Sequence, residues 1–369
     1  MLRPTRTKQK VDFKGAMMDP DDILWLYNST EVYENYSITG EFVTLCPKRN
    51  VNLFSAQFLP AFYYSIFLLS LLGNGLVLYI IYKYEKLSSM TNIFLLNLVI
   101  SDLVFAFSLP FWATYHSSEW IFGGPLCKLV SSVYYIGFYS SILFLTLMTL
   151  DRYLAVVHAI TSLKRRRNVY AVISSAAVWC VSILACLKKI ILFDVRENGD
   201  SGTLCEETDF SKEVMTRWQL IGDYQQFVLF FLLPLAIVLY CYTRITVKIV
   251  HSRMKEKFRA VKIIFVIIVT FFVCWTPYNV VVLLRAIQAS ASGSTGSCAD
   301  ELDYALYVTR NIAFLYCCIS PVFYTFVGKK FRGHFQKMLA KRTPCLPSQC
   351  STNQSSRTTS QRIPHTIHE

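Results

Sequence analysis

Three neighbouring charged and phenolic side chains stand at the end of a long apolar stretch of the sequence. The stretch covers residues 130–150, and Asp151, Arg152 and Tyr153 follow it directly. Charges at the end of a membrane-spanning helix are tolerated when they reach the interface or pair with each other. Because an Asp–Arg pair can hold one arrangement of helices and release it to another, these residues predict a conformational switch.

The remaining polar residues do not indicate catalysis. The six histidines are scattered along the chain, and their spacing matches neither a metal-ligand set nor a nucleophile with its base. We therefore expect no enzyme, no metal and no cofactor, and nothing points to nucleic acid. A transporter, the remote alternative, would usually show repeated halves or acids in several spans. Here only Asp102 stands near the centre of an apolar stretch.

Long apolar helices must position these residues. The chain has 369 residues, of which 53% are hydrophobic and 17% charged, whereas about 25% charge is usual in soluble domains. A membrane span needs about 20 apolar residues, and seven windows meet that length. The sequence predicts an all-α membrane protein, a seven-transmembrane helix bundle. Its expected spans are 57–82, 92–115, 127–157, 169–193, 221–247, 260–287 and 303–327.

The Lys and Arg residues set the orientation. The loops after spans one, three and five hold about fourteen of them, and those after spans two, four and six about seven. The N-terminus is therefore expected outside and the C-terminus inside. We expect an extracellular, acidic and glycosylated segment (1–55), the bundle (56–328), a short amphipathic membrane-surface helix (329–341) and a disordered cytoplasmic tail rich in Ser and Thr (342–369).

Cysteines and modifiable side chains follow this topology. Four cysteines lie outside, which allows three pairings. We favour Cys127 with Cys205 and Cys46 with Cys298. Glycosylation is predicted at the sequons of Asn28 and Asn35. Palmitoylation at Cys345 and Cys350 is weighed equally against free thiols. Phosphorylation is considered at Ser351, Thr352, Ser355, Ser356, Thr358, Thr359 and Ser360.

Short motifs, each in its expected span, resemble the rhodopsin class of G-protein-coupled receptors over residues 55–340. They are Gly73-Asn74, Leu98, Asp102, Asp151-Arg152-Tyr153, Trp179, Pro234, Tyr242, Cys274-Trp275-Thr276-Pro277, Pro321 and Tyr324. Within that class, residues 108–112, 151–159 and 274–279 and the four outer cysteines resemble the chemokine receptors. Residues 224–226, 251–262 and 310–314 are most similar to the lymphotactin (XC) subgroup, and the CC type is the close alternative.

The resemblance implies a small basic chemokine as the ligand, and the outer charges agree. The protein has a net charge of +13, yet residues 19–41 contain six acids and no Lys or Arg. Opposite charge steers a partner to its site. The tyrosines here suit sulfation, although a solvated tail would have a similar composition. The candidate docking residues are Asp19, Asp21, Asp22, Tyr27, Glu31, Tyr33, Glu34, Tyr36, Glu206 and Glu207.

A second ligand contact is expected among the spans. Tyr64, Trp112, Tyr134 and Tyr278 are candidates to line an outward-facing cavity, with simple packing as the alternative. Many chemokine receptors carry a glutamate where this chain has Arg310. Arginine should favour a different end of the ligand, or pair with an acid of the receptor such as Asp223 or Glu207.

The resemblance also implies how the switch works. Pro277 removes a backbone donor and forms a hinge below the cavity, where Trp275 would sense the ligand. Arg152, released by Asp151, would meet Tyr242 and Tyr324 and open a cleft for the terminal helix of a G protein. Basic loops would contact acidic lipids, and a phosphorylated tail would recruit arrestin.

Asp102 is expected to need a polar neighbour near the bilayer centre. Asn74 and Ser141 are candidates, and the family allows a sodium ion there. Ser320 and Tyr316 depart from the usual motif. The expected function is that of a plasma-membrane chemokine receptor that activates an inhibitory-class G protein, giving calcium signalling and chemotaxis. A non-signalling chemokine scavenger and a receptor for another peptide are the alternatives.

Overall fold

Seven helical segments of the described chain are long and apolar enough to cross a membrane, as the hydropathy pattern predicts. The computed structural model describes residues 49–84, 89–158, 167–198, 202–207, 212–252, 255–291, 300–327 and 333. The elements are α2 (Arg49–Tyr84), α3 (Met90–Ser117), α4 (Gly123–Val157), α5 (Arg167–Leu192), β1 (Phe193–Asn198), β2 (Gly202–Glu207), α6 (Lys212–Phe227), η1 (Val228–Leu232), α7 (Leu233–Ser252), α8 (Lys255–Ala291), α9 (Asp300–Phe314) and α10 (Tyr316–Val327).

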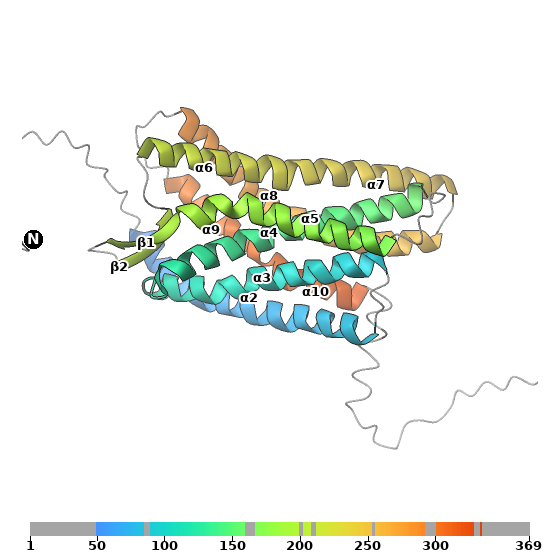
Figure 1. The fold of residues 1–369 in the computed structure, drawn as a ribbon, viewed down its shortest axis with the longest axis horizontal. Coiled ribbons are helices and arrows are strands. Elements are labelled where there is room, and N and C mark those ends of the chain that lie inside the picture. The colour runs from blue at the N-terminus through green and yellow to red at the C-terminus, as the bar shows by residue number, and fades with distance from the viewer. Residues whose placement is uncertain are drawn as a thin grey trace, which may run out of the picture. The chain divides into compact units, whose positions relative to one another are not determined.

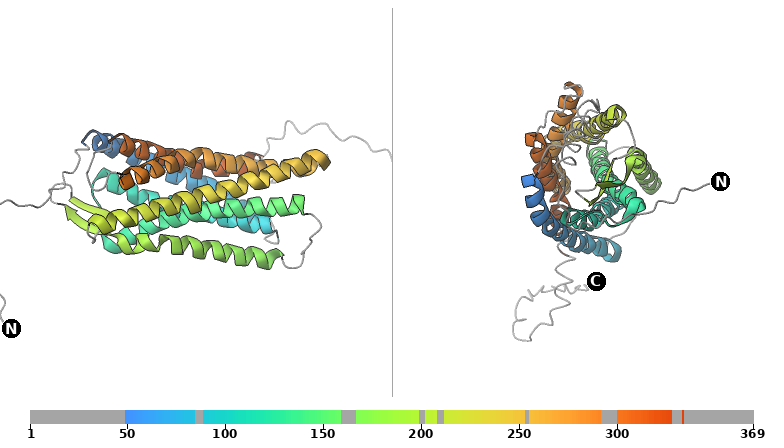
Figure 2. Two further views of the ribbon diagram at one scale, coloured as in Figure 1. Left: turned by 90° about the horizontal axis from the view of Figure 1, so that it is seen from above. Right: turned by 90° about the vertical axis from the view of Figure 1, so that its left-hand side faces the viewer.

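The helices lie side by side with their long axes roughly aligned (Figure 1) and surround a common core when viewed end-on (Figure 2). Large apolar side chains such as Leu72 and Val273 are exposed on the outside of the bundle. In a water-soluble protein such a surface would be costly, whereas lipid tails solvate it. The helices therefore form a multi-pass membrane protein with seven spans.

Two spans consist of more than one helix because their backbone hydrogen bonding is interrupted. In the fifth span, the π-helical turn η1 separates α6 from α7. Pro234 follows this turn and lacks the backbone N–H that a regular helix would use there. In the seventh span, a turn at Leu315 separates α9 from α10, and the Leu315 N–H donates to the carbonyl of Ile312 at 3.2 Å.

Close packing in the middle of the bundle depends on a glycine of α4. A Cβ atom at Gly137 would lie 2.7 Å from the backbone nitrogen of Phe105 on α3. That distance is shorter than van der Waals contact, so a larger residue would force the helices apart. Phe105 is thereby brought against Tyr134, with ring centroids 5.1 Å apart. The approach of α3 to α4 positions residues of the cavity described below.

A β-hairpin at one end of the bundle was not predicted from the sequence. Strands β1 and β2 pair antiparallel, with Val195 opposite Cys205. Cys205 forms a disulfide with Cys127 at the start of α4, and their Cα atoms lie 5.7 Å apart. The predicted Cys127–Cys205 pairing is therefore confirmed. We call the end of the bundle that carries this hairpin the outer end.

Candidate functional site

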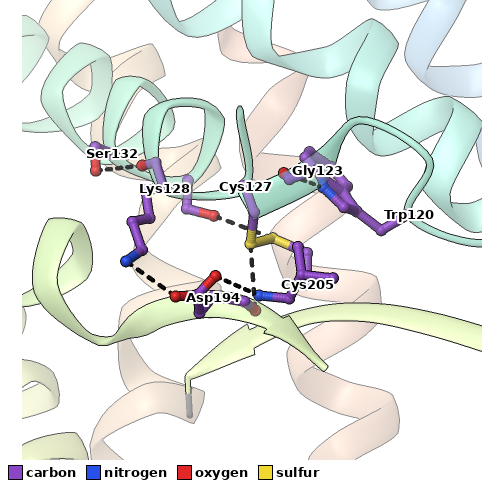
Figure 3. Close-up of a disulfide and its surroundings, with 9 residues drawn as sticks. Trp120, Gly123, Cys127, Lys128, Ser132, Asp194 and Cys205 are labelled. Atoms are coloured by element: carbon purple, nitrogen blue, oxygen red, sulfur yellow. Dashed lines mark hydrogen bonds and ion pairs between the residues drawn. A yellow bond between two sulfur atoms is a disulfide. The ribbon is translucent and has the colours of Figure 1, made fainter. Parts of the chain in front are cut away.

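The hairpin is held over the outer end by polar contacts around the disulfide (Figure 3). The Lys128 ammonium lies 3.0 Å from the Asp194 carboxylate, which also accepts the Val195 backbone N–H at 2.8 Å. The Val195 N–H and the Lys128 ammonium lower the pKa of Asp194 below its ordinary value. On the other strand, the Thr203 carbonyl accepts the Trp120 backbone N–H at 2.8 Å. Both strands are thus fixed to the bundle.

A cavity of about 120 Å³ lies at the outer end, where β1 meets the helices. Its walls are mostly aromatic, and α2, α3, α4, α8, α9 and β1 all contribute to them. The lining residues are Tyr63, Trp112, Ser131, Tyr134, Tyr135, Phe193, Tyr278, Arg310 and Phe314. An apolar pocket with a few polar groups is the usual form of a small ligand-binding site.

Three of the four candidate cavity residues line this cavity, namely Trp112, Tyr134 and Tyr278, and the candidate ligand contact Arg310 lines it as well. Tyr64 does not, because its side chain is 43% exposed and its hydroxyl lies 3.1 Å from the Thr114 hydroxyl. Its neighbour Tyr63 lines the cavity instead. Successive residues of a helix point about 100° apart, so the choice between two adjacent tyrosines depends on how α2 is rotated in the bundle.

The cavity also has four lining residues that were not predicted from the sequence: Ser131, Tyr135, Phe193 and Phe314. A partial signal existed for Ser131 and Tyr135, since they stand four residues apart and thus share one helix face, next to Tyr134. Phe193 gave no such signal, because it reaches the cavity only through the hairpin.

The two acids considered as partners of Arg310 are engaged elsewhere. The Glu207 carboxylate lies 2.5 Å from the Lys189 ammonium and 3.9 Å from that of Lys188, and the Glu207 side chain is only 8% exposed. The positive charges that act on Asp223 are those of Lys189, Arg285 and Lys188. The predicted pairing of Arg310 with Asp223 or Glu207 is therefore wrong. Because the Glu207 carboxylate is directed at two lysines of the receptor, its position does not support the predicted role of Glu207 in docking the ligand.

Arg310 is surrounded by phenols instead. The Tyr63 hydroxyl is hydrogen-bonded to the guanidinium, whose central carbon lies 5.5 Å from the centroid of the Tyr307 ring. The other groups that interact electrostatically with Arg310 are Tyr134, Tyr135 and Tyr278. The Nε atom of Arg310 is buried and has no hydrogen-bond partner within the described part of the chain. A positive charge therefore lies in a cavity that contains no carboxylate among its lining residues.

Stacked aromatic rings continue from the cavity into the middle of the bundle. Trp275 on α8 contacts Tyr278 edge-on at 6.0 Å, and it stacks on Phe138 of α4 at 4.0 Å. The ring centroid of Phe271, which lies one turn before Trp275 in α8, is 5.8 Å from that of Trp275. Pro277 lies inside α8 between Trp275 and Tyr278. Trp275 is thus in direct contact with Tyr278 of the cavity wall, and the predicted hinge lies between these two residues in the sequence.

Asp102 on α3 accepts two hydrogen bonds in the buried centre of the bundle. The Ser141 hydroxyl donates to Oδ1 and the Ser320 hydroxyl donates to Oδ2, each at 2.8 Å. The predicted neighbour Ser141 is in place, and Ser320 is a partner that sequence analysis treated only as a departure. Asn74 donates instead to the Ser70 hydroxyl and the Cys317 carbonyl, each at 3.1 Å. It therefore fastens α2 to α10.

The oxygen atoms around Asp102 are compatible with the sodium ion that the resemblance allows. Carboxylate and hydroxyl oxygens are the ligands of hard cations. The amide oxygen of Asn74 is also buried and has no hydrogen-bond partner among the described residues. Bound sodium would neutralise the buried carboxylate of Asp102, with Ser141 and Ser320 as further oxygen donors.

The Asp–Arg pair at the opposite end of the bundle is formed. The Arg152 guanidinium lies 2.8 Å from the Asp151 carboxylate, which is 2% exposed. The same oxygen of Asp151 accepts the hydroxyl of Thr91 from α3 at 2.8 Å. Thr91 has no sequence signal, because only the packing of α3 on α4 brings it to Asp151. The carboxylate of the expected switch is thus held by Arg152 and by Thr91 of a neighbouring helix.

The tyrosines near the switch have different surroundings. The Tyr242 hydroxyl is buried without a hydrogen-bond partner among the described residues, and it lies within the electrostatic influence of Arg152. The Tyr153 hydroxyl lies 3.3 Å from the Nε2 atom of His158. Pro321 is buried in α10, where it packs close to Gly73 of α2. Tyr324 lies in the same helix, but its side chain falls outside the described residues.

Several predicted sites lie outside the described residues. They include the second predicted disulfide, the acidic N-terminal segment, the sequons, the amphipathic helix apart from Gly333, and the tail. The residues concerned are Cys46, Cys298, Asp19, Asp21, Asp22, Tyr27, Glu31, Tyr33, Glu34, Tyr36, Asn28, Asn35, Cys345, Cys350, Ser351, Thr352, Ser355, Ser356, Thr358, Thr359 and Ser360.

Comparison with known proteins agrees with this arrangement. Residues 73–324 match the family described as 7 transmembrane receptor (rhodopsin family), and the chain belongs to that family of non-enzymatic receptors. It is 39% identical to C-C chemokine receptor type 4 of Homo sapiens over 87% of this chain and 88% of the relative. Within the family, it is therefore a chemokine-receptor-like member.

Two further relatives are also named as C-C chemokine receptors. C-C chemokine receptor type 3 of Macaca mulatta is 37% identical over 87% of this chain and 93% of the relative. C-C chemokine receptor type 1 of Homo sapiens is 38% identical over 84% of this chain and 88% of the relative. These relatives favour the CC subgroup, which was the alternative, and give no support to the preferred XC subgroup over it.

Proposed function

We propose that this protein is a plasma-membrane chemokine receptor that binds a small basic chemokine at its outer end and activates an inhibitory-class heterotrimeric G protein. The expected response is calcium signalling and leukocyte chemotaxis. The observation that carries the proposal is the Asp151–Arg152 pair at 2.8 Å, located at the end of the bundle opposite the cavity. Relatives named as chemokine receptors over most of their length support the ligand class.

The proposed mechanism joins the two ends. The acidic segment 19–41 attracts the ligand, and part of the ligand enters the cavity next to Tyr278. Tyr278 contacts Trp275 directly, so a ligand that displaces it biases the hinge at Pro277. Movement of the inner part of α8 then exposes Arg152 to the G protein.

The modified segments have supporting roles in this proposal. Glycans at Asn28 and Asn35 and sulfate on Tyr27, Tyr33 or Tyr36 would belong to the outer segment. Palmitoylation at Cys345 or Cys350 would anchor the tail, and phosphorylation of its hydroxyl groups would recruit arrestin.

Cells that express the chain test the proposal. Calcium release and inhibition of cyclic AMP would be measured against a panel of chemokines that includes ligands of C-C receptors and lymphotactin. At least one chemokine should give a response, and Arg152→Ala should retain binding while the response is lost. A silent panel, with receptor confirmed at the cell surface, would exclude the signalling function.

The alternative of a scavenger predicts a different result. A scavenger takes up chemokine without any Arg152-dependent response, so uptake of labelled chemokine is measured in the same cells. The intact Asp151-Arg152-Tyr153 motif with its formed ion pair favours signalling.

A further inference from the structure

The cavity at the outer end has hydrogen-bond donors without acceptors. The Nε of Arg310 and the Nε1 of Trp112 are both buried without a partner in the described residues. Guanidinium and indole groups can only donate. The Tyr134 hydroxyl is also buried without a partner there. Because unpaired buried donors cost free energy, a ligand that supplies acceptors would be favoured in this cavity.

The charge of the cavity points in the same direction. Arg310 is the one ionisable residue among the lining residues that carries a full charge at neutral pH. Glu207, the acid of the hairpin, is occupied by Lys189 at 2.5 Å. The immediate partners of the guanidinium are neutral phenols, which cannot balance its charge. A buried charge without a counterion is strongly unfavourable, so an entering anion would gain both charge pairing and hydrogen bonds.

We propose that this cavity binds a carboxylate that the protein ligand presents, with Arg310 as its counterion and Trp112 and Tyr134 as further donors. The proposal rests on the proposed function, because it places the anion on the ligand. A guanidinium binds a carboxylate through two parallel N–H···O bonds, and the surrounding rings accept the apolar part of the same side chain. A cavity of about 120 Å³ has room for such a group but not for a folded domain.

The proposal separates two parts of the ligand by charge. A basic surface of the ligand is attracted to the acidic outer segment, whereas the part that enters the cavity carries an acid. An ammonium group in the cavity would meet Arg310 with like charge and would leave the donors unpaired. We therefore expect that ligands with an Asp or Glu in the segment that enters the cavity are preferred over those with a Lys or a chain amine there.

Small aromatic probes test the cavity without knowledge of the ligand. The purified receptor in lipid nanodiscs is heated with benzoate, benzamide or benzylamine at constant ionic strength, and thermal unfolding is recorded. Benzoate should raise Tm, whereas the other two should not. Arg310→Gln should weaken benzoate binding about tenfold or more, and Arg310→Lys should give an intermediate result because the planar fork is lost.

Controls decide whether the effect belongs to this cavity. Arg196 lies on β1 at the same end of the bundle and is exposed, so Arg196→Gln removes an outer arginine without touching the cavity and should keep the benzoate shift. The Tm of each variant without probe reports folding. Equal shifts with chloride would mean an adventitious ion only, and equal benzoate shifts in wild type and Arg310→Gln would overturn the proposal.

A second arm separates this inference from the proposed function. In cells, Arg310→Glu should lose its response to an active chemokine and regain it with a chemokine variant whose entering acid is changed to Lys. If benzoate binds through Arg310 but no chemokine gives a response, the proposed function is contradicted, and so is the assignment of the carboxylate to a chemokine. The anion-binding site itself would still be supported by the benzoate result. If chemokines give full responses with Arg310→Gln and Arg310→Glu, the inference fails while the function stands.

Discussion

At the scale of single residues, the proposed resting switch depends on more than its two charges. Asp151 and Arg152 are adjacent in the sequence, and their contact requires only a suitable rotamer. The hydrogen bond from Thr91 is different, because it fastens the Asp151 carboxylate to a neighbouring helix. Thr91 therefore couples the orientation of the switch to the packing of α3 on α4.

This contact predicts the behaviour of Thr91→Val, which keeps the shape of the side chain and removes the hydroxyl. The hydrogen bond from Thr91 to Asp151 is lost, so Arg152 should be released more readily, and basal G-protein activation should rise about threefold. Nucleotide exchange in membranes without ligand measures it. Thr243→Val is the matched control, since the Thr243 hydroxyl bonds only within its own helix. Unchanged basal exchange in Thr91→Val would contradict the prediction.

Ion pairing at the outer end gives a second prediction. Burial by itself would raise the pKa of Glu207, but the Lys189 ammonium and its hydrogen bond outweigh burial and lower that pKa below the ordinary value of 4.5. Because the folded state has the lower pKa, this pair contributes its full stability above pH 4.5, and the contribution is lost as the pH falls through the folded pKa.

Thermal unfolding of wild type and Glu207→Gln between pH 7 and pH 3.5 tests this pair. Wild type should be more stable at pH 7, and the difference should shrink as the pH falls below 4.5. Asp194→Asn should show a smaller change in the same direction, because the ion pair of Asp194 with Lys128 is exposed to solvent. A constant difference between wild type and Glu207→Gln would show that the charge of Glu207 does not contribute.

At the scale of elements, the hairpin determines the outer end of the site. Phe193 of β1 lines the cavity, and Glu207 at the end of β2 binds the lysines of α5. The Cys127–Cys205 disulfide is the covalent link that places these strands over the helices. The hairpin thus serves as a fixed wall of the cavity.

The double variant Cys127→Ser and Cys205→Ser should lose this wall. The disulfide closes a separation of 78 residues, and removal of such a link costs about 2–4 kcal/mol of stability. We expect a lower Tm and weaker ligand binding, measured by thermal unfolding and by chemokine binding at the cell surface. Cys180→Ser is the control, because Cys180 is a free, exposed cysteine. Wild-type Tm in the double variant would contradict this view.

At the scale of the whole molecule, the cavity and the Asp151–Arg152 pair lie at opposite ends, so the proposed function requires that they communicate through the packed core. Trp275 is suited to this task, because it contacts both Tyr278 of the cavity wall and Phe138 of α4. Helix α4 continues from Phe138 to the Asp151–Arg152 pair. Contact alone does not demonstrate coupling, so a functional measurement is required.

Trp275→Leu provides that measurement. The variant removes the stack on Phe138, so chemokine affinity should stay within about threefold of wild type while the maximal response falls about fivefold or more. Trp179→Leu is the control, since Trp179 packs on Phe144 and Asn97 outside this chain of rings. An equal loss of affinity and response in Trp275→Leu would assign Trp275 to binding instead of transmission.

Much of the fold was predictable because each span is a property of about 20 consecutive residues. The windows at 92–115 and 127–157 agree with α3 and α4, and the cysteines of the outer loops gave the confirmed disulfide. The hairpin was missed because its residues lack a strong alternating pattern and their pairing depends on a turn and a covalent link. Of two adjacent tyrosines, Tyr63 was missed because helix rotation is set by neighbouring helices.

The seven spans and the family follow from the sequence alone, and the residues of the proposed switch can be named from it, since hydropathy, charge and motifs are local features of the chain. The contacts between side chains of different helices became evident only in the tertiary structure. The packing brings Thr91 to Asp151 and Ser320 to Asp102. It also places Arg310 among phenols, while Glu207 pairs with Lys189. The physical reason is that such contacts join side chains from different helices, and their geometry depends on the packing of the whole bundle.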